Sequence, residues 1–78
     1  MFPKVTFTKV QAMLWEKHKD ALFAAFDFGV VPVLSFGYDC SAKDKTSGQR
    51  VYLASGLTKR DAMRAVVKMI LATDSRFQ

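Results

Sequence analysis

Catalytic chemistry in this chain would have to come from a short set of side chains. The sequence holds one cysteine, Cys40, one histidine, His18, and seven Asp and Glu residues spread along it. A thiol activated by an imidazole is the nucleophile that these residues would permit, with Asp39 or Asp44 orienting the ring. Cys40 lies in a stretch rich in Ser, Lys and Gly, which is typical of a loop too mobile for a preorganised site. We therefore expect a protein that is not an enzyme.

Metal and cofactor binding lack the residue patterns that they require. A zinc site takes several Cys and His ligands. His18 is better interpreted as a hydrogen-bonded residue beside an apolar helix stripe. The four glycines form neither a phosphate loop nor a dinucleotide fingerprint. The sequence predicts no metal and no cofactor.

A basic helix start is the feature that most favours binding. Lys59 and Arg60 occupy the first turn of an expected helix, where the positive end of the macrodipole favours acidic residues. Arg64 and Lys68 continue a basic stripe at four-residue spacing, and Gly56 would let backbone approach closely to the free N–H groups, where an anion would be favoured. The predicted site for an anion or an acidic partner comprises Lys59, Arg60, Arg64, Lys68, Lys43 and Lys45. An ordinary solvated helix face is the alternative interpretation.

Residues 56–66, Gly-Leu-Thr-Lys-Arg-Asp-Ala-Met-Arg-Ala-Val, carry short resemblances to two families. The stretch resembles the start of the second helix of double-stranded RNA-binding domains, whose basic residues contact phosphates. It is also similar to a segment near the N-terminus of HU-type DNA-bending proteins. Met63 replaces a basic residue of the first family, the predicted strands number two instead of three, and the β-arm of HU does not follow. We therefore assign the chain to neither family. Nucleic-acid binding is kept as the alternative function.

Aromatic side chains indicate a second kind of surface. Trp15, Phe23 and Phe26 fall beside or outside the apolar stripe of the first expected helix, so some of them would face solvent. Aromatic residues are enriched at protein interfaces, which makes these three a candidate aromatic interface. A wide stripe buried on two sides is the alternative. Tyr38 and Tyr52, expected on opposite faces of a hairpin, could instead stack on single-stranded bases.

Composition bounds the class of protein. The 78 residues have room for a single domain, and half of them are hydrophobic, enough to build a core. A chain this short with one cysteine gains no disulfide, so a homo-oligomer is a reasonable expectation. The lone cysteine fits a reducing compartment, and no apolar run approaches the roughly 20 residues that span a bilayer, so we expect a cytoplasmic protein. The net charge of +5 favours phosphates or acidic protein surfaces as partners.

The periodicity of apolar residues predicts a small two-layer α+β domain over residues 1–78, in the order helix, strand, strand, helix. The expected elements are a helix from Thr8 to about Phe28, a strand over 31–39, a mobile hairpin loop over 39–48, a strand over 49–55, a helix capped by Thr58, and a frayed end over 74–78. Asp20 could cap a second, shorter helix, so the sequence allows either one or two helices in the N-terminal region. A third strand could lie at residues 4–7, making a sheet of two or three antiparallel strands packed by two helices.

These features together predict a small interaction protein that binds a macromolecular partner and blocks or recruits it. The partner would be a protein with an acidic or nucleic-acid-binding surface, and DNA or RNA is the alternative. Small inhibitors of host proteins that phages and other mobile elements encode have this character.

Overall fold

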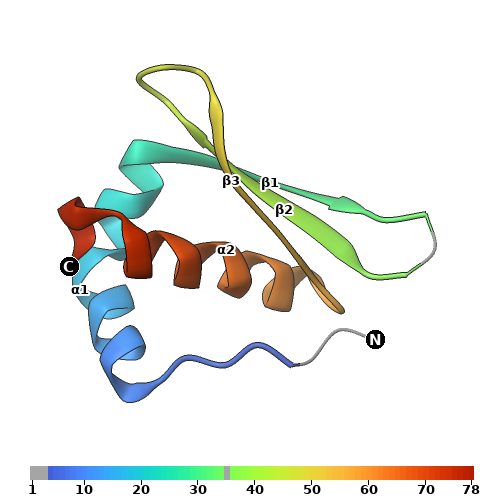
Figure 1. Ribbon diagram of the computed structural model, residues 1–78, viewed down its shortest axis with the longest axis horizontal. Coiled ribbons are helices and arrows are strands. Elements are labelled where there is room, and N and C mark those ends of the chain that lie inside the picture. Colours follow the sequence, from blue (N-terminus) through green and yellow to red (C-terminus); the bar gives the residue numbers. More distant parts are fainter. Residues whose placement is uncertain (1–3, 35) are drawn as a thin grey trace.

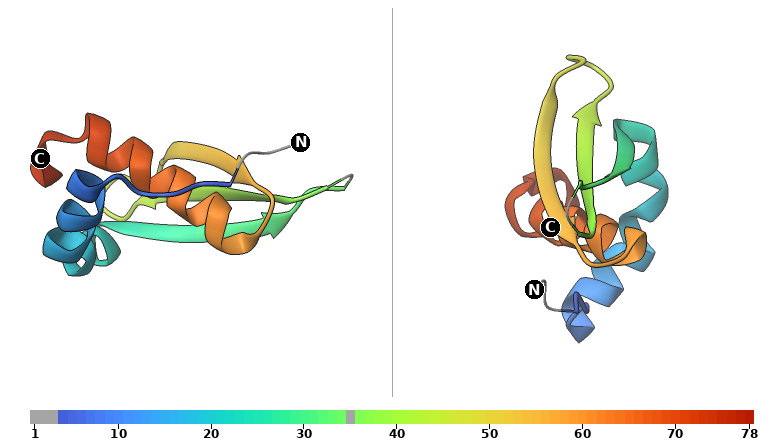
Figure 2. Two further views of the ribbon diagram at one scale, coloured as in Figure 1. Left: turned by 90° about the horizontal axis from the view of Figure 1, so that it is seen from below. Right: turned by 90° about the vertical axis from the view of Figure 1, so that its right-hand side faces the viewer.

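The computed structural model describes residues 4–34 and 36–78, which form one sheet and two long helices (Figure 1). The elements are α1 (Lys9–Ala25), β1 (Phe26–Pro32), β2 (Tyr38–Asp44), β3 (Arg50–Gly56), α2 (Lys59–Thr73) and a short 3-10 helix, η1 (Ser75–Phe77). The strands are antiparallel in the order β1-β2-β3. α2 lies along the sheet, whereas α1 stands at one end and packs against α2 and β1 (Figures 1 and 2). The predicted α+β class is confirmed.

The start of α1 follows the predicted capping box. The Thr8 hydroxyl accepts a hydrogen bond from the Gln11 N–H at 3.1 Å, and the Gln11 side chain accepts one from the Thr8 N–H at 2.9 Å. The helix is continuous, so Asp20 does not begin a second one. It ends at Ala25, and the predicted extension to Phe28 is wrong because the chain changes there to an extended backbone.

The predicted strand over residues 31–39 is wrong, since this stretch contains the turn between β1 and β2. The aromatic residues before it form β1 instead, with Phe26 and Phe28 alternating toward the core. The Val33 N–H donates to the Gly37 carbonyl at 3.0 Å, and Gly37 has a φ of 88°, which favours glycine. The third strand is therefore β1, and residues 4–7 form none.

The predicted loop over residues 39–48 is wrong for its first half, which belongs to the central strand β2. Cys40 and Ala42 are fully buried toward α2, so their small side chains let the helix approach the sheet. Alternation along the strand directs Ser41 and Lys43 to the opposite face. The turn between β2 and β3 begins only at Lys45, where the Thr46 N–H donates to the Asp44 carboxylate at 2.8 Å.

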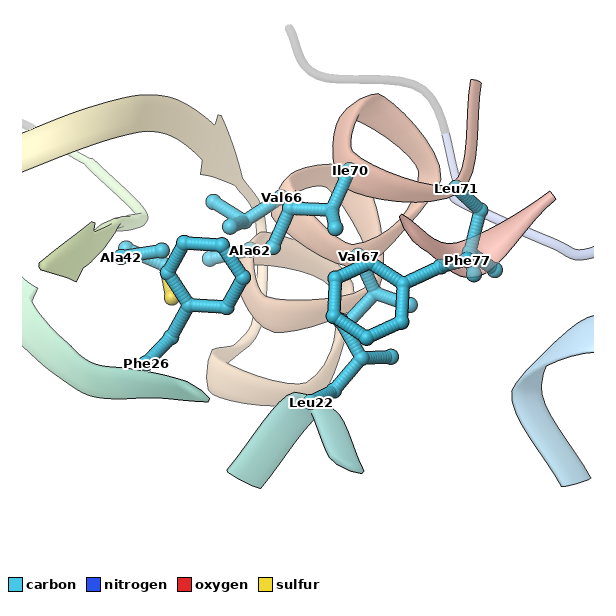
Figure 3. Packing of buried hydrophobic residues seen from close by; sticks show 10 residues of the cluster. Leu22, Phe26, Ala42, Ala62, Val66, Val67, Ile70, Leu71 and Phe77 are labelled. Atoms are coloured by element: carbon cyan, nitrogen blue, oxygen red, sulfur yellow. The ribbon is translucent and has the colours of Figure 1, made fainter. Parts of the chain in front are cut away.

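The core lies between α2 and the sheet and reaches the C-terminal end (Figure 3). Its buried apolar residues are Leu22, Phe26, Cys40, Ala42, Ala62, Val66, Val67, Ile70, Leu71 and Phe77. The frayed end predicted over residues 74–78 is wrong, because η1 turns the Phe77 ring into this cluster and leaves it 3% exposed. The first turn of η1 is held by the Asp74 side chain, which accepts from the Arg76 N–H at 3.0 Å.

Candidate partner-binding surface

The first turns of α2 carry exposed cations that have no acidic partner. Thr58 caps the helix, its hydroxyl accepting from the Asp61 N–H at 3.1 Å, as the sequence predicts. Lys59 and Arg60 are exposed, and the Lys59 ammonium lies 5.8 Å from the centre of the Tyr38 ring. Within the described ranges, neither cation forms an ion pair with a carboxylate. Their charge is therefore available to a partner.

Arg64 and Lys68 have a structural role that the sequence did not reveal. They hold the extended segment of residues 4–8, which we call the strap, against α2 (Figure 1). The Lys68 ammonium donates to the Thr6 carbonyl at 3.0 Å. The Arg64 guanidinium donates to the Val5 carbonyl at 3.5 Å and lies 5.8 Å from the centre of the Phe7 ring. Part of the predicted basic stripe thus binds the chain itself.

The remaining two cations of the predicted site lie elsewhere. Lys45 binds the C-terminal end of α1. Its ammonium donates to the Phe23 carbonyl at 3.0 Å and lies 3.8 Å from the Asp27 carboxylate. Lys43 is exposed near the same end of the sheet, and the seven residues of β3 separate that end from α2's start by about 20 Å. The structure therefore divides the six predicted residues instead of joining them in one patch.

Gly56 lies against the backbone of the first turns of α2. A Cβ at this position would lie 2.6 Å from the Asp61 carbonyl carbon and 2.9 Å from the Ala62 Cα. The space beside Gly56 is filled by the backbone of α2, so the glycine serves the packing of β3 against the helix. The predicted close approach of backbone at Gly56 is therefore present, and anion binding at the start of α2 stays a prediction.

Exposed apolar side chains occur at the same end of the molecule as the free cations. The turn after β1 projects past the first turn of α2 at the same end of the molecule (Figures 1 and 2). Leu34 is fully exposed there and Phe36 is 56% exposed. Leu57, which precedes α2, is 37% exposed. We call the surface made by Leu34, Phe36, Leu57, Lys59 and Arg60 the tip.

Sequence reasoning missed the apolar half of the tip because Leu34 and Phe36 were placed inside a strand. The signal that could have found it is the sequence Val-Pro-Val-Leu-Ser-Phe-Gly, in which Pro32 and Gly37 bracket a turn.

The candidate aromatic interface is divided as well. Phe26 is 2% exposed and belongs to the core, so its assignment to an interface is wrong. Trp15 is half-buried between Phe7 and Phe23. The centre of its ring lies 6.3 Å from that of Phe7 and 5.7 Å from that of Phe23. Phe23 is 45% exposed.

The two tyrosines lie on one face of the sheet, not on opposite faces. Both point toward the side on which Cys40 and Ala42 are buried, as the strand register requires. The Tyr52 hydroxyl hydrogen-bonds with the Thr73 hydroxyl at 3.1 Å. Their expected placement on opposite faces is therefore wrong, and stacking on bases stays a prediction.

Cys40 and His18 have the properties of core residues. Cys40 has no exposed surface, and burial raises the pKa of its thiol, which disfavours the thiolate nucleophile. The His18 ring packs edge-on against Phe77 at 5.8 Å. Its Nε2 is buried and, among the described residues, has no hydrogen-bond partner, whereas the sequence predicts a hydrogen-bonded histidine. No group of three or more His, Cys, Asp or Glu residues suited to a metal occurs in residues 4–34 and 36–78.

The face of the sheet turned away from α2 carries exposed apolar residues on its two edge strands, β1 and β3, with polar residues of β2 between them. Val31, Val51 and Leu53 alternate onto this face and are about half exposed, at 57%, 48% and 52%. The expected self-association stays a prediction, with this face and the tip as its candidate surfaces.

Comparison with known proteins finds no family model, no curated protein and no solved structure that matches this chain. Neither described helix is long and apolar enough to cross a membrane. A functional assignment therefore rests on the surfaces of this chain alone.

Proposed function

We propose that this chain is a small interaction protein, without catalysis, that binds a protein partner through the tip and blocks or recruits that partner. The observation that carries the proposal is the pairing of apolar and basic groups at one end of the molecule. Leu34 and Phe36 are exposed at the same end of the molecule as Lys59 and Arg60, which have no carboxylate partner in the described residues. Apolar anchors surrounded by charge are the usual composition of a protein interface. The partner's matching surface would be apolar at its centre and acidic at its rim.

A nucleic-acid partner fits the tip less well. Phosphate binding commonly draws on 6–10 basic contacts. On α2, Arg64 and Lys68 already donate to carbonyls of the strap, which leaves Lys59 and Arg60. Leu34 and Phe36 would gain little from contact with a phosphate backbone.

A free cysteine further fits a protein that works in the cytoplasm.

Nucleic-acid binding is still a second candidate, because the fold removes one objection to it. The chain has three strands between its two helices, not the two that the sequence predicts. Three is the number that the resemblance of residues 56–66 to double-stranded RNA-binding domains implies. Under this alternative, Lys59 and Arg60 would contact phosphates.

Affinity purification of the tagged protein, with nuclease treatment, tests the first candidate. The double variant Leu34→Ser, Phe36→Ser should lose a stoichiometric protein partner. A control with Val51→Ser, Leu53→Ser, which removes about half-exposed apolar groups from the sheet face, should retain it. Capture that survives loss of the tip residues would refute the proposal.

A salt titration with fluorescent duplex RNA tests the second candidate. Phosphate binding predicts an affinity that falls steeply with salt, with a slope reduced by about one for each of Lys59→Ala and Arg60→Ala. Tight, salt-dependent RNA binding would favour the nucleic-acid function over the protein partner. Negligible binding at low salt would eliminate it.

A further inference from the structure

A pocket of about 420 Å³ opens between α1 and α2, beside the strap. Its apolar walls are Phe7 of the strap, Trp15 of α1, and Met63 and Val67 of α2. We call it the interhelix pocket. Two aromatic rings and a methionine make walls of the kind that receive a large apolar group, and the volume falls within the range of ligand sites.

The rim of the interhelix pocket is positively charged. Arg60 and Arg64 line it, and Glu16 is the one carboxylate among the described residues that line it. Glu16 is paired with Lys19 at 3.1 Å, and among the described residues neither arginine has a carboxylate partner. An occupant with a negative charge beside an apolar group would therefore complement both wall and rim.

A second hollow, of about 720 Å³, continues from the same rim. It lies over the start of α2 and is lined by Lys4, Leu57, Thr58 and Asp61, which is only 7% exposed. Arg60 and Arg64 line this hollow too, so they stand between the two depressions. An elongated ligand could lie across both, which a compact small molecule would not do.

We propose that the interhelix pocket receives one large apolar side chain of an acidic peptide segment, whose carboxylates lie along Arg60 and the start of α2. This deepens the proposed function and rests on it, since the segment would belong to the protein partner. The apolar side chain supplies the anchor, and the cations fix the direction in which the segment lies.

The test uses a synthetic peptide, acetyl-Glu-Asp-Phe-Asp-Glu-amide, and the full chain. Trp15 is the sole tryptophan and forms part of the pocket wall, so its fluorescence reports occupancy. We expect the peptide to shift this fluorescence in a saturable way. Replacing its Phe by Ala should weaken binding about tenfold, and replacing its four acids by Lys should abolish binding.

Two variants of α1 test the pocket without removing a core contact. Ala12→Phe places a ring at the edge of the pocket and should block the peptide. Ala24→Phe is the matched control, since Ala24 is an exposed alanine of α1 outside the pocket lining, and it should bind normally. Equal binding by the two variants would overturn the pocket as the site.

Charge variants test the rim. Arg60→Gln should weaken the peptide several-fold, whereas Glu16→Gln should strengthen it about twofold because it removes the opposing charge. Asp20→Asn, the same charge change at an exposed position of α1 away from the lining, should leave affinity unchanged. Strengthening that is equal in both acid variants would show only long-range attraction and would refute a specific rim.

The outcomes separate this inference from the proposed function. Absence of peptide binding, with partner capture still dependent on Leu34 and Phe36, overturns the pocket assignment and leaves the proposed function standing. Peptide binding in the expected pattern, with partner capture independent of the tip, supports the pocket and overturns the tip as the interface.

Discussion

Phe77, near the end of the chain, should be a major contributor to stability. Its ring is 3% exposed and lies 6.3 Å from the Phe26 ring and 5.8 Å from the His18 ring, centre to centre. Arg76 covers it, with the guanidinium carbon 5.2 Å from the ring centre. A buried phenylalanine removes about 150–250 Å² from water, worth about 4–6 kcal/mol at about 25 cal/mol per Å². Alanine retains part of this, and the short η1 can detach, so we expect Phe77→Ala to cost about 3 kcal/mol.

Equilibrium unfolding in urea, followed by circular dichroism, measures this cost. A domain of this size is stable by roughly 5–10 kcal/mol, so the midpoint should fall by a large fraction while the slope stays unchanged. Phe77→Leu, which retains most of the apolar volume, should cost about 1 kcal/mol. Ser75→Ala, at an exposed position of η1, is the control. If Phe77→Ala lies within about 0.5 kcal/mol of the control, the docking of η1 against the core is refuted.

Three further predictions concern the backbone, a carboxylate and the thiol. Gly56→Ala should lower the free energy of unfolding by at least about 2 kcal/mol in the same assay, because its Cβ meets the backbone of α2. Gly29→Ala is the control: its Cβ meets a hydroxyl at 3.6 Å and should cost little, and equal costs would contradict the close approach at Gly56. The hydrogen bond from Arg76 lowers the pKa of Asp74. The free energy of unfolding of the wild type should therefore exceed that of Asp74→Asn at pH 7, and this difference should disappear as the pH falls below about 4. A difference that persists in acid would disprove the linkage. Burial raises the pKa of Cys40. Alkylation by iodoacetamide, followed by mass spectrometry, should therefore be at least about a hundredfold slower in the native protein than in urea. Comparable rates would indicate that Cys40 is a reactive thiol.

Local signals predicted both helix starts, and non-local pairing explains where the prediction failed. Thr8 and Thr58 each bond an N–H three residues ahead, which is a pattern contained in four consecutive residues. β2 has no such signature. As the central strand it bonds to neighbours on both sides, so polar residues such as Asp39 and Ser41 are tolerated on its open face. Phe28 continued the apolar spacing of α1, and only pairing with β2 makes it part of a strand.

The candidate site was harder to predict than the fold. Sequence shows that Arg64 and Lys68 are charged, but their acceptors are backbone carbonyls, which every residue possesses. The same reason hid the role of Lys45 at the end of α1. Lys59 and Arg60 form no ion pair with a carboxylate of the described residues, so their availability to a partner stays a prediction.

The direct passage from α1 into β1 has a consequence for the length of the chain at that point. Ala25 ends the helix and Phe26 begins the strand, with no connecting residue to absorb a change. One inserted residue would either rotate Leu22 by about 100° around the helix or reverse the two faces of β1, exposing the ring of Phe26. The turn from Lys45 to Gln49 joins β2 and β3 without such a helical phase. Insertions should therefore be tolerated in that turn and rejected at the α1–β1 junction.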